Sequence, residues 1–329
     1  MGLLHEGGAY HHPAFEPEFN DCSFGYRPRR SPHHALRKIW RELMDGYQWV
    51  VDADLRDYFG SVEHEKLIDM VAEKVSDGRV LSLIRQMLKA GCMEEGKYLP
   101  SPKGTPQGGV ISPMLANVYL HYVLDLWFTV KIKRECRGES YLGRYCDDFL
   151  CFFQYQDDAE AFYGKLIDRL RKFNLEIAEE KTKIIEFGRF AEERRSKRGK
   201  GKPETFDFLG FTHYCSKSKN SNFRVKRKIS RKKFKAKLKD FAEWLHENMH
   251  TEIGDLIKQI NAKLVGHYRC YGITDNSNGI RAFGYRIRRK LFEILNRRSQ
   301  KKSLTWEGFA KLEERFPLAK ARIYVNIYG

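Results

Sequence analysis

The run Tyr145-Cys146-Asp147-Asp148-Phe149 places two adjacent aspartates inside an apolar stretch of this 329-residue sequence. Burying one unpaired carboxylate is costly, and two neighbouring carboxylates also repel each other. A fold therefore keeps such a pair mainly where cations compensate the charge. Mg²⁺ is the expected cation, because it prefers hard oxygen ligands and is often held by one or two carboxylates together with a substrate phosphate. The run predicts a divalent-metal site.

A third acidic ligand is expected from residues 49–59. Read with a period of two, the odd-numbered residues from 49 to 55 are apolar and face one side of a strand, while Asp52 and Asp54 face the other. Asp54 lies where this strand should end, which is a common position for active-site groups. The spacing alone leaves Asp52, Asp54 and Asp57 open as the third ligand.

A glycine-rich segment, residues 104–117, leads into an expected helix. Its paired glycines allow the backbone to approach a ligand closely, and Ser112 followed by Pro113 is typical of a helix start, with the helix continuing to about Trp127. A glycine-rich turn that feeds a helix N-terminus favours binding of an anion or a nucleotide.

Taken together, these segments resemble the reverse transcriptases encoded by bacterial and organellar group II introns, also called intron maturases. The resemblance extends over nearly the whole chain in ordered blocks, which are residues 23–31, 54–59, 105–117, 145–148, 180–183 and 208–211. In the family pattern an aromatic residue follows the first metal ligand by five positions, as Phe59 follows Asp54. Cys146 stands where the family usually has alanine, a small change that should leave metal binding intact.

The resemblance implies an RNA-directed DNA polymerase that transfers nucleotides with two Mg²⁺ ions, for which Mn²⁺ can substitute. Asp54 and Asp147 would be catalytic and would bridge the two ions, Asp148 would be a further catalytic ligand, and the Leu55 carbonyl an additional one.

The resemblance also implies contacts to the substrates. Phe59 would exclude a 2′-hydroxyl, and Gln107 with Gly108 would position the incoming nucleotide. Lys181 or Lys183 would bind or protonate pyrophosphate. Two further implied sites are a substrate contact at Arg27 and a primer grip at Leu209 and Gly210.

The composition independently predicts a polyanionic partner. The formal net charge is +17, with 60 Lys and Arg against 43 Asp and Glu. Between positions 189 and 239 the sequence holds 19 Lys or Arg against four Asp or Glu, with aromatic residues interleaved, a pattern that suits RNA and single strands. The residues expected to bind nucleic acid are Lys226, Arg227, Lys228, Arg231, Lys232, Lys233, Lys235, Arg288 and Arg289.

The predicted fold class is α+β. Residues 1–47 are expected to form a residual fingers segment with a helix from 32 to 44. Residues 48–215 should form a reverse-transcriptase palm built on a split βαβ sheet. A linker at 215–222 should lead to a helical thumb, or maturase (X) domain, at 216–329. Expected palm elements are a strand at 48–55, core helices at 64–75 and 79–89, a hairpin at 140–155, and a helix capped by Asp157 or Asp158. Expected thumb helices are 230–247, 252–269 and 280–298.

Other features bound the function. Seven cysteines without a Cys-x-x-Cys motif argue against a disulfide framework and a structural zinc site. No apolar leader is evident, so a cytoplasmic, nucleoid-associated protein without a membrane partner is expected. Expected partners are an RNA template, in particular the protein's own intron RNA, a DNA primer, target DNA and dNTPs.

Because little sequence precedes residue 15, most of the fingers are expected to be missing. Two alternatives therefore stay open: an RNA-binding maturase with an idle polymerase site, and a domesticated polymerase in repair or phage defence.

Overall fold

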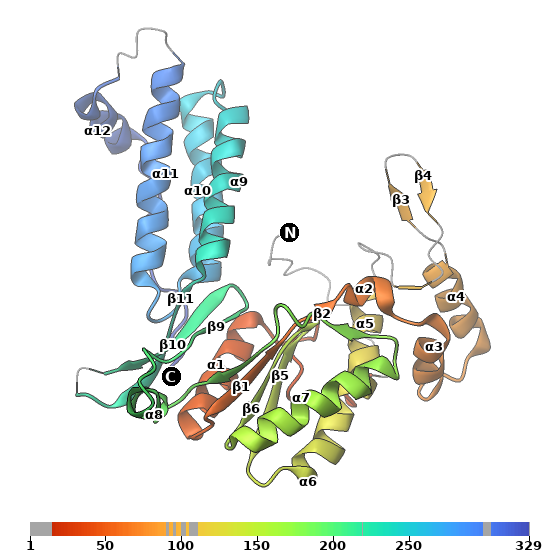
Figure 1. Ribbon diagram of the computed structural model, residues 1–329. Coiled ribbons are helices and arrows are strands. Elements are labelled where there is room, and N and C mark those ends of the chain that lie inside the picture. The colour runs from red at the N-terminus through yellow and green to blue at the C-terminus, as the bar shows by residue number, and fades with distance from the viewer. Residues whose placement is uncertain are drawn as a thin grey trace. The chain divides into compact units, whose positions relative to one another are not determined.

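The computed structural model describes residues 15–89, 92–94, 97–99, 103–104, 111–218, 220–298 and 304–328. The chain divides into two compact units (Figure 1). The first comprises Met1–Leu209 and Tyr214–Val225, and the second comprises Gly210–His213 and Lys226–Gly329. No helix among the described residues is long and apolar enough to cross a membrane.

The first unit is built on a four-stranded sheet. Its strands are β1 (Trp49–Ala53), β5 (Ser140–Tyr145), β6 (Asp148–Phe153) and β8 (Lys183–Glu186), in the order β5-β6-β1-β8. Every neighbouring pair is antiparallel, so β1 and β5 run parallel to each other with β6 between them. This is the split βαβ arrangement, and it confirms the predicted α+β palm.

Both faces of this sheet are covered, because successive side chains of a strand point to opposite sides. On one face Phe153 packs against Phe162 of α7 (Gln156–Arg171), the helix that crosses the sheet in Figure 1. On the other face Phe152 contacts Tyr47 and Tyr141, and α1 (Pro32–Asp45) lies against β5. The sheet is therefore held between helices, which fixes the ends of its strands.

Shorter elements surround the sheet. These are β2 (Leu55–Arg56), α2 (Tyr58–Ser61), α3 (His64–Ala72), α4 (Gly78–Lys89), β3 (Cys92–Glu94), β4 (Lys97–Leu99), β7 (Glu176–Ile177) and α8 (Ala191–Lys197). A continuous helical stretch comprises α5 (Ser112–Leu120), two π-helical segments η1 (His121–Asp125) and η2 (Phe128–Ile132), and α6 (Lys133–Glu135).

The second unit contains the helices α9 (Arg231–Glu247), α10 (Ile253–Tyr271), α11 (Ser277–Arg297) and α12 (Trp306–Arg315). The predicted apolar stripe of α10, Leu256, Ile260 and Leu264, is buried. The first three helices agree with the expected thumb helices. A three-stranded sheet has the order β11-β10-β9, with β9 (Phe206–Phe208), β10 (Phe211–Lys217) and β11 (Phe223–Ile229). Strand β9 belongs to the first unit, and β10 and β11 each have residues in both units.

Three sequence-based expectations about local structure were wrong. The expected linker at 215–222 is shorter than predicted, because β10 continues to Lys217, and β11 begins at Phe223. Helix α7 begins before the expected caps: Asp157 and Asp158 lie in its first turn, and Asp158 accepts hydrogen bonds from the backbone of Arg137 and Gly138 instead. Ser112 is the first residue of α5 rather than its cap.

The apolar stripe of α4 is only partly core. Ile84 and Leu88 are buried, whereas Val80, Leu83 and Met87 are exposed. Helical spacing identifies an apolar stripe but does not say how much of it a neighbouring element covers.

Candidate active site

Asp54 stands at the point where the chain leaves the four-stranded sheet. Strand β1 ends at Ala53, and β2 begins at Leu55, which pairs with Ile177 of β7. The Asp54 carbonyl accepts a hydrogen bond from the Ala178 amide at 2.8 Å, and its own amide donates to Thr182 Oγ1 at 3.4 Å. Its backbone is thus fixed on both sides, while its side chain stays 49% exposed.

The hairpin between β5 and β6 presents the paired aspartates at the same edge. Tyr145 pairs with Asp148, so Cys146 and Asp147 form the connecting turn, with Cys146 in the left-handed region at φ 60°. Strand register places Ala53 opposite Phe149, which puts the end of β1 beside the start of β6. The sheet therefore brings Asp54 together with Asp147 and Asp148.

Burial, together with the neighbouring carboxylates, shifts the protonation equilibria at this edge. Burial, together with the charges of Asp52, Asp147 and Asp54, raises the pKa of Asp148 to about 7. Burial also raises the pKa of Asp147, and the charge of Asp54 adds to this effect. Shifts of this kind, with a specific charged neighbour, are typical of functional sites.

Asp52 belongs to the same group of carboxylates. Burial and the charges of Asp207 and Asp54 raise its pKa to about 7. Asp207 comes from β9 and was not expected at the site. Among the described residues, no three His, Cys, Asp or Glu side chains converge on a single point as a ready ligand set.

Lys181 forms an ion pair with one of these carboxylates. Its Nζ lies 3.1 Å from Asp54 Oδ2, and both side chains are largely exposed. The expected alternative, Lys183, lies on β8 opposite Asp52, and its charge lowers the pKa of Asp52. Both lysines of the 180–183 block therefore face the carboxylates.

The other residues that were expected to contact substrate are described only in part. Phe59 is half-buried and packs edge-on against Tyr58, with ring centroids 5.2 Å apart. Leu209 and Gly210 form a turn with φ values of 50° and 81°, and the Leu209 amide donates a hydrogen bond to Asp148. Gln107 and Gly108 lie outside the described residues.

Arg27 does not fit the expected role as a substrate contact. It is buried and donates hydrogen bonds to Glu16 and to the carbonyls of Asn20 and Ser23. All of these partners are internal, so Arg27 holds the loop before α1 in place.

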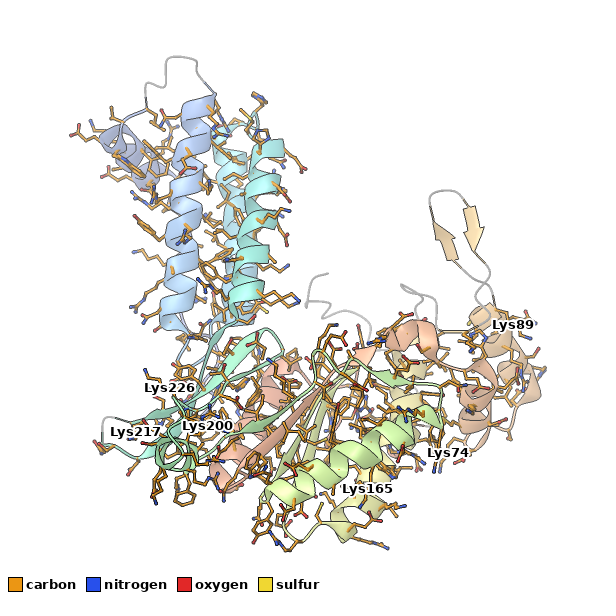
Figure 2. The ribbon with its side chains drawn as sticks, viewed as in Figure 1. Lys74, Lys89, Lys165, Lys200, Lys217 and Lys226 are labelled. Carbon is orange, nitrogen blue, oxygen red and sulfur yellow. The ribbon has the colours of Figure 1, made fainter. Side chains whose placement is uncertain are left out.

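Two of the expected nucleic-acid contacts also have structural roles. Arg227 is fully buried, with its guanidinium over the ring of Tyr328. Arg288 makes a bidentate pair with Glu313, with Nη2 2.5 Å from Oε2, and thereby attaches α12 to α11. Lys226 is half-buried, and the other expected contacts are exposed: Lys228, Arg231, Lys232, Lys233, Lys235 and Arg289. Basic side chains also cover the outside of the first unit, as Lys74 and Lys165 illustrate (Figure 2).

Sequence reasoning missed the buried arginine that precedes the paired aspartates. Arg144 is fully buried and pairs with Asp125, with Nε 2.8 Å from Oδ1 and Nη2 2.6 Å from Oδ2. Its Nη1 also donates to Asn117 Oδ1 and to the Cys146 carbonyl, both at 2.8 Å. An arginine inside an apolar strand was the available signal, because a buried charge requires partners.

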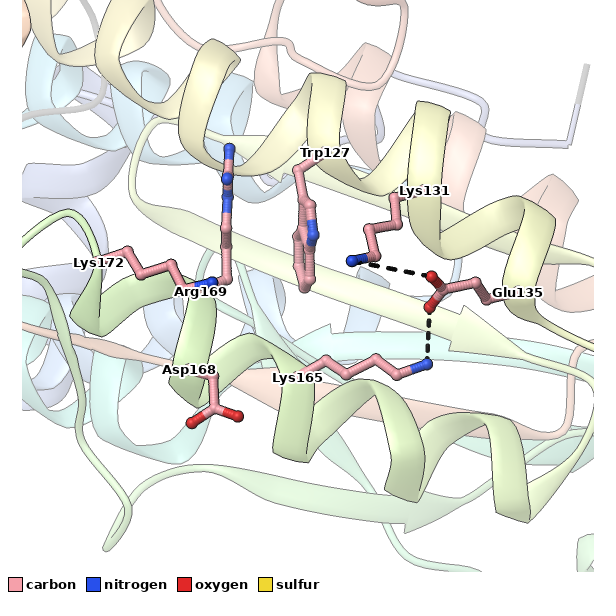
Figure 3. A pocket seen from close by; sticks show the side chains of 7 residues that line it. All are labelled: Trp127, Lys131, Glu135, Lys165, Asp168, Arg169 and Lys172. Carbon is pink, nitrogen blue, oxygen red and sulfur yellow. Dashed lines mark hydrogen bonds and ion pairs between the residues drawn. The ribbon is translucent and has the colours of Figure 1, made fainter.

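A cavity of about 390 Å³ lies between α7 and the helical stretch that ends in α6 (Figure 3). Glu135 forms an ion pair with Lys165 across it, and a second one with Lys131, four residues earlier on the same helical stretch. Arg169 donates to the carbonyls of Tyr122 and Val123. Lys131, Lys165 and Arg169 are thus already bonded within the protein, and the lining of this cavity contains none of the carboxylates described above.

Comparison with known proteins identifies relatives of this chain. A profile for "Reverse transcriptase (RNA-dependent DNA polymerase)" matches residues 10–213. The chain is 43% identical over 126 residues to the group II intron-encoded protein LtrA of Lactococcus lactis subsp. cremoris, an alignment that covers 38% of this chain and 20% of LtrA. It is 40% identical over 131 residues to the protein YkfC of Escherichia coli (strain K12), covering 37% of this chain and 34% of YkfC. The chain thus spans only about a fifth to a third of these relatives.

The structure of apo telomerase from Candida tropicalis shares the fold. Its TM-score is 0.51 at 13% identity, and the alignment covers 93% of this chain and 50% of that one.

The raised pKa of Asp148 predicts a pH-dependent cost to folding in metal-free buffer. A carboxyl whose pKa lies near 7 when folded and near 3.9 when unfolded stabilises the folded state at low pH, and this contribution is lost as the pH rises between these values. Asp148→Asn cannot ionise, so its melting temperature should exceed that of the wild type by a margin that widens from pH 4 to pH 7 and is constant above. Thermal unfolding in EDTA measures this margin. A margin independent of pH would contradict the assigned environment of Asp148.

Proposed function

The chain belongs to the reverse transcriptase (RNA-dependent DNA polymerase) family, and on this premise we propose that it is an RNA-directed DNA polymerase of the group II intron type. The observation that carries the proposal is the group of carboxylates at one sheet edge, formed by Asp54 at the end of β1 and by Asp147 and Asp148 in the β5–β6 hairpin. The similarity to LtrA supports the group II type.

The donor set suits divalent metal ions, and Mg²⁺ in particular. The carboxylates of Asp54, Asp147 and Asp148 are hard oxygen ligands. Burial, with neighbouring carboxylates, raises the pKa values of Asp147 and Asp148, and a cation would stabilise their ionised forms. We assign Asp54 and Asp147 as shared ligands, with Asp148 and the Leu55 carbonyl as further ones. When bound, such ions lower the pKa of the primer 3′-hydroxyl and neutralise charge on the triphosphate and the leaving pyrophosphate.

The protein's own residues supply orientation and selectivity. Lys181, which pairs with Asp54 here, is placed to bind the negative charge of pyrophosphate once a substrate is present. The ring of Phe59 excludes a 2′-hydroxyl, and the Leu209–Gly210 turn holds the primer end beside Asp148. Gln107 and Gly108 keep their proposed role at the incoming nucleotide.

The proposed partners are an RNA template, a DNA primer and dNTPs, and the template includes the intron RNA that encodes the protein. The exposed lysines and arginines of β11, α9 and α11 would bind the phosphate backbone. The second candidate function is an RNA-binding maturase whose polymerase site is idle. The crowded carboxylates favour the polymerase, because a protein that only binds RNA has no use for grouped acidic side chains.

Replacing one metal ligand should remove polymerase activity without weakening RNA binding. Asp54→Ala and Asp147→Ala each delete a carboxylate but no basic contact, so primer extension on poly(rA)/oligo(dT) with Mg²⁺ should fall by about a hundredfold or more. RNA affinity, measured in parallel, should stay at the wild-type value. Asp168→Ala, on the exposed surface of α7, is the matched control and should retain activity.

Full extension by either variant would remove these residues from the site. A wild-type chain that binds RNA but extends no primer would favour the maturase alternative.

Truncating Phe59 should relax the choice of sugar. Phe59→Val makes room beside the 2′-carbon, so the ratio of ribonucleotide to deoxynucleotide incorporation should rise by about tenfold, since one steric group typically discriminates at this level. Single-nucleotide incorporation kinetics with matched rNTP and dNTP measure the ratio. Phe173→Val changes another half-buried phenylalanine of the same core and should leave the ratio unchanged. An unchanged ratio in Phe59→Val would assign Phe59 to the core alone.

RNA affinity should fall steeply with salt, and α9 should account for part of the slope. Each neutralised phosphate contributes about 0.7 to 0.9 to the slope of log affinity against log salt. Reversing Lys232, Lys233 and Lys235 to Glu should therefore weaken binding and flatten the slope. The control reverses Lys74, Lys131 and Lys165, exposed lysines already paired with acidic residues. Equal slopes for the wild type and the α9 variant would exclude this face from RNA binding.

A further inference from the structure

The Cys146–Asp147 turn is attached to a buried polar network. The network consists of Arg144, Asp125 and Asn117, and all three side chains are at most 2% exposed. Each acceptor that Arg144 contacts lies at 2.6 to 2.8 Å, which is the range of charge-assisted hydrogen bonds. One of these acceptors is the carbonyl of Cys146, the residue directly before Asp147.

The same network reaches the segment before α1. Asn117 Nδ2 donates to the Gly25 carbonyl at 2.6 Å, while its Oδ1 accepts from Arg144. The backbone of Arg144 also pairs with this segment: its amide donates to the Cys22 carbonyl at 2.8 Å, and its carbonyl accepts from the Phe24 amide at 2.9 Å. Residues 22–25 and the turn are thus held by one set of side chains.

Gly25 leaves no room between this segment and the turn. A Cβ built on Gly25 would lie 2.6 Å from the Cys146 amide nitrogen and 2.3 Å from its sulfur. The segment therefore contacts the turn directly, and Arg144 is bonded to the same turn. The left-handed backbone of Cys146 is the strained conformation that such surroundings have to maintain.

Asp125 in turn is fixed within the helix. It is the last residue of the π-helical segment η1, and its carbonyl accepts hydrogen bonds from Thr129 Oγ1 at 2.9 Å and Asn20 Nδ2 at 3.2 Å. Single π-helical turns often occur at functional sites. Here the irregular turn carries the only carboxylate that the structure pairs with Arg144 among the described residues.

We propose that Arg144, Asp125 and Asn117 form a clamp that sets the position of Asp147, and that Arg144 is a positioning residue for the reaction. This inference rests on the proposed polymerase function. The inference goes beyond that function because it assigns a role to residues that touch neither a substrate nor the side chain of a proposed metal ligand. It also makes residues 22–25 part of the support of the site.

The decisive variant is Arg144→Met/Asp125→Leu. Removing one partner would leave an uncompensated buried charge, whereas replacing both with apolar residues of similar volume is often neutral for folding. The double variant should therefore fold, as circular dichroism and thermal unfolding would show. Its kcat for primer extension should fall by about a hundredfold, because a small misplacement of a catalytic group has an effect of this size. The KM for dTTP should change by no more than about threefold.

A second readout does not depend on catalysis. Mn²⁺ binding, followed by electron paramagnetic resonance, should weaken by about tenfold to a hundredfold in the double variant, which is typical when the support of a metal ligand is lost. Gly25→Ala should have the same two effects without touching the buried charges, because its methyl group must displace the turn. Arg169→Met, which removes a half-buried arginine bonded to Tyr122 and Val123, is the control and should preserve both kcat and Mn²⁺ affinity.

The outcomes separate the clamp from the polymerase assignment. A folded double variant with wild-type kcat and Mn²⁺ affinity would overturn the clamp. If the double variant does not fold, Gly25→Ala decides by the same criteria. If the wild-type chain extends no primer, the polymerase proposal fails, and the Mn²⁺ affinities of wild type and variants still test the clamp.

Discussion

The burial of several carboxylates beside one another is the constraint on which the candidate site depends. Asp52, Asp54, Asp147 and Asp148 lie at one edge of the sheet, and the raised pKa values of three of them measure how strongly ionisation is opposed there. Attraction cannot hold such a group together. The sheet register, the backbone hydrogen bonds at Asp54 and the buried Arg144–Asp125 pair do so, because each fixes a backbone position independently of the charge on the side chains.

The fold could be predicted where its determinants are local in the sequence. Alternation in residues 49–55 and the apolar runs around Asp147 are typical of paired strands, and the structure contains β1, β5 and β6 at these places. A strand as short as β9, with three residues, has too few residues to show a period. The exposed side of α4 was also beyond prediction, since its burial depends on what other segments cover it.

In the candidate site, too, residues with a local sequence pattern could be predicted, whereas residues whose role depends on distant partners could not. The adjacent aspartates could be proposed from their residue type and apolar setting. For the third ligand, spacing left Asp52, Asp54 and Asp57 open, and the family resemblance selected Asp54. The basic residues were harder, because the role of an arginine depends on its partner. Arg27 and Arg288 are paired with Glu16 and Glu313, which lie 11 and 25 residues away, and no local pattern distinguishes these arginines from ones that bind RNA. Asp207 joins the carboxylates from a strand too short to predict.

The backbone of Asp54 has a thermodynamic consequence for substrate binding. Its carbonyl and amide are both bonded within the protein, while its carboxylate remains accessible to solvent. The conformational entropy of this residue's backbone is therefore already lost when the chain folds, and only side-chain rotation remains to be restricted when a ligand binds. A residue on a mobile loop would lose both at the moment of binding. Because the chain passes from one sheet to another between Ala53 and Leu55, this loss of backbone entropy occurs once, on folding, and not at each binding event.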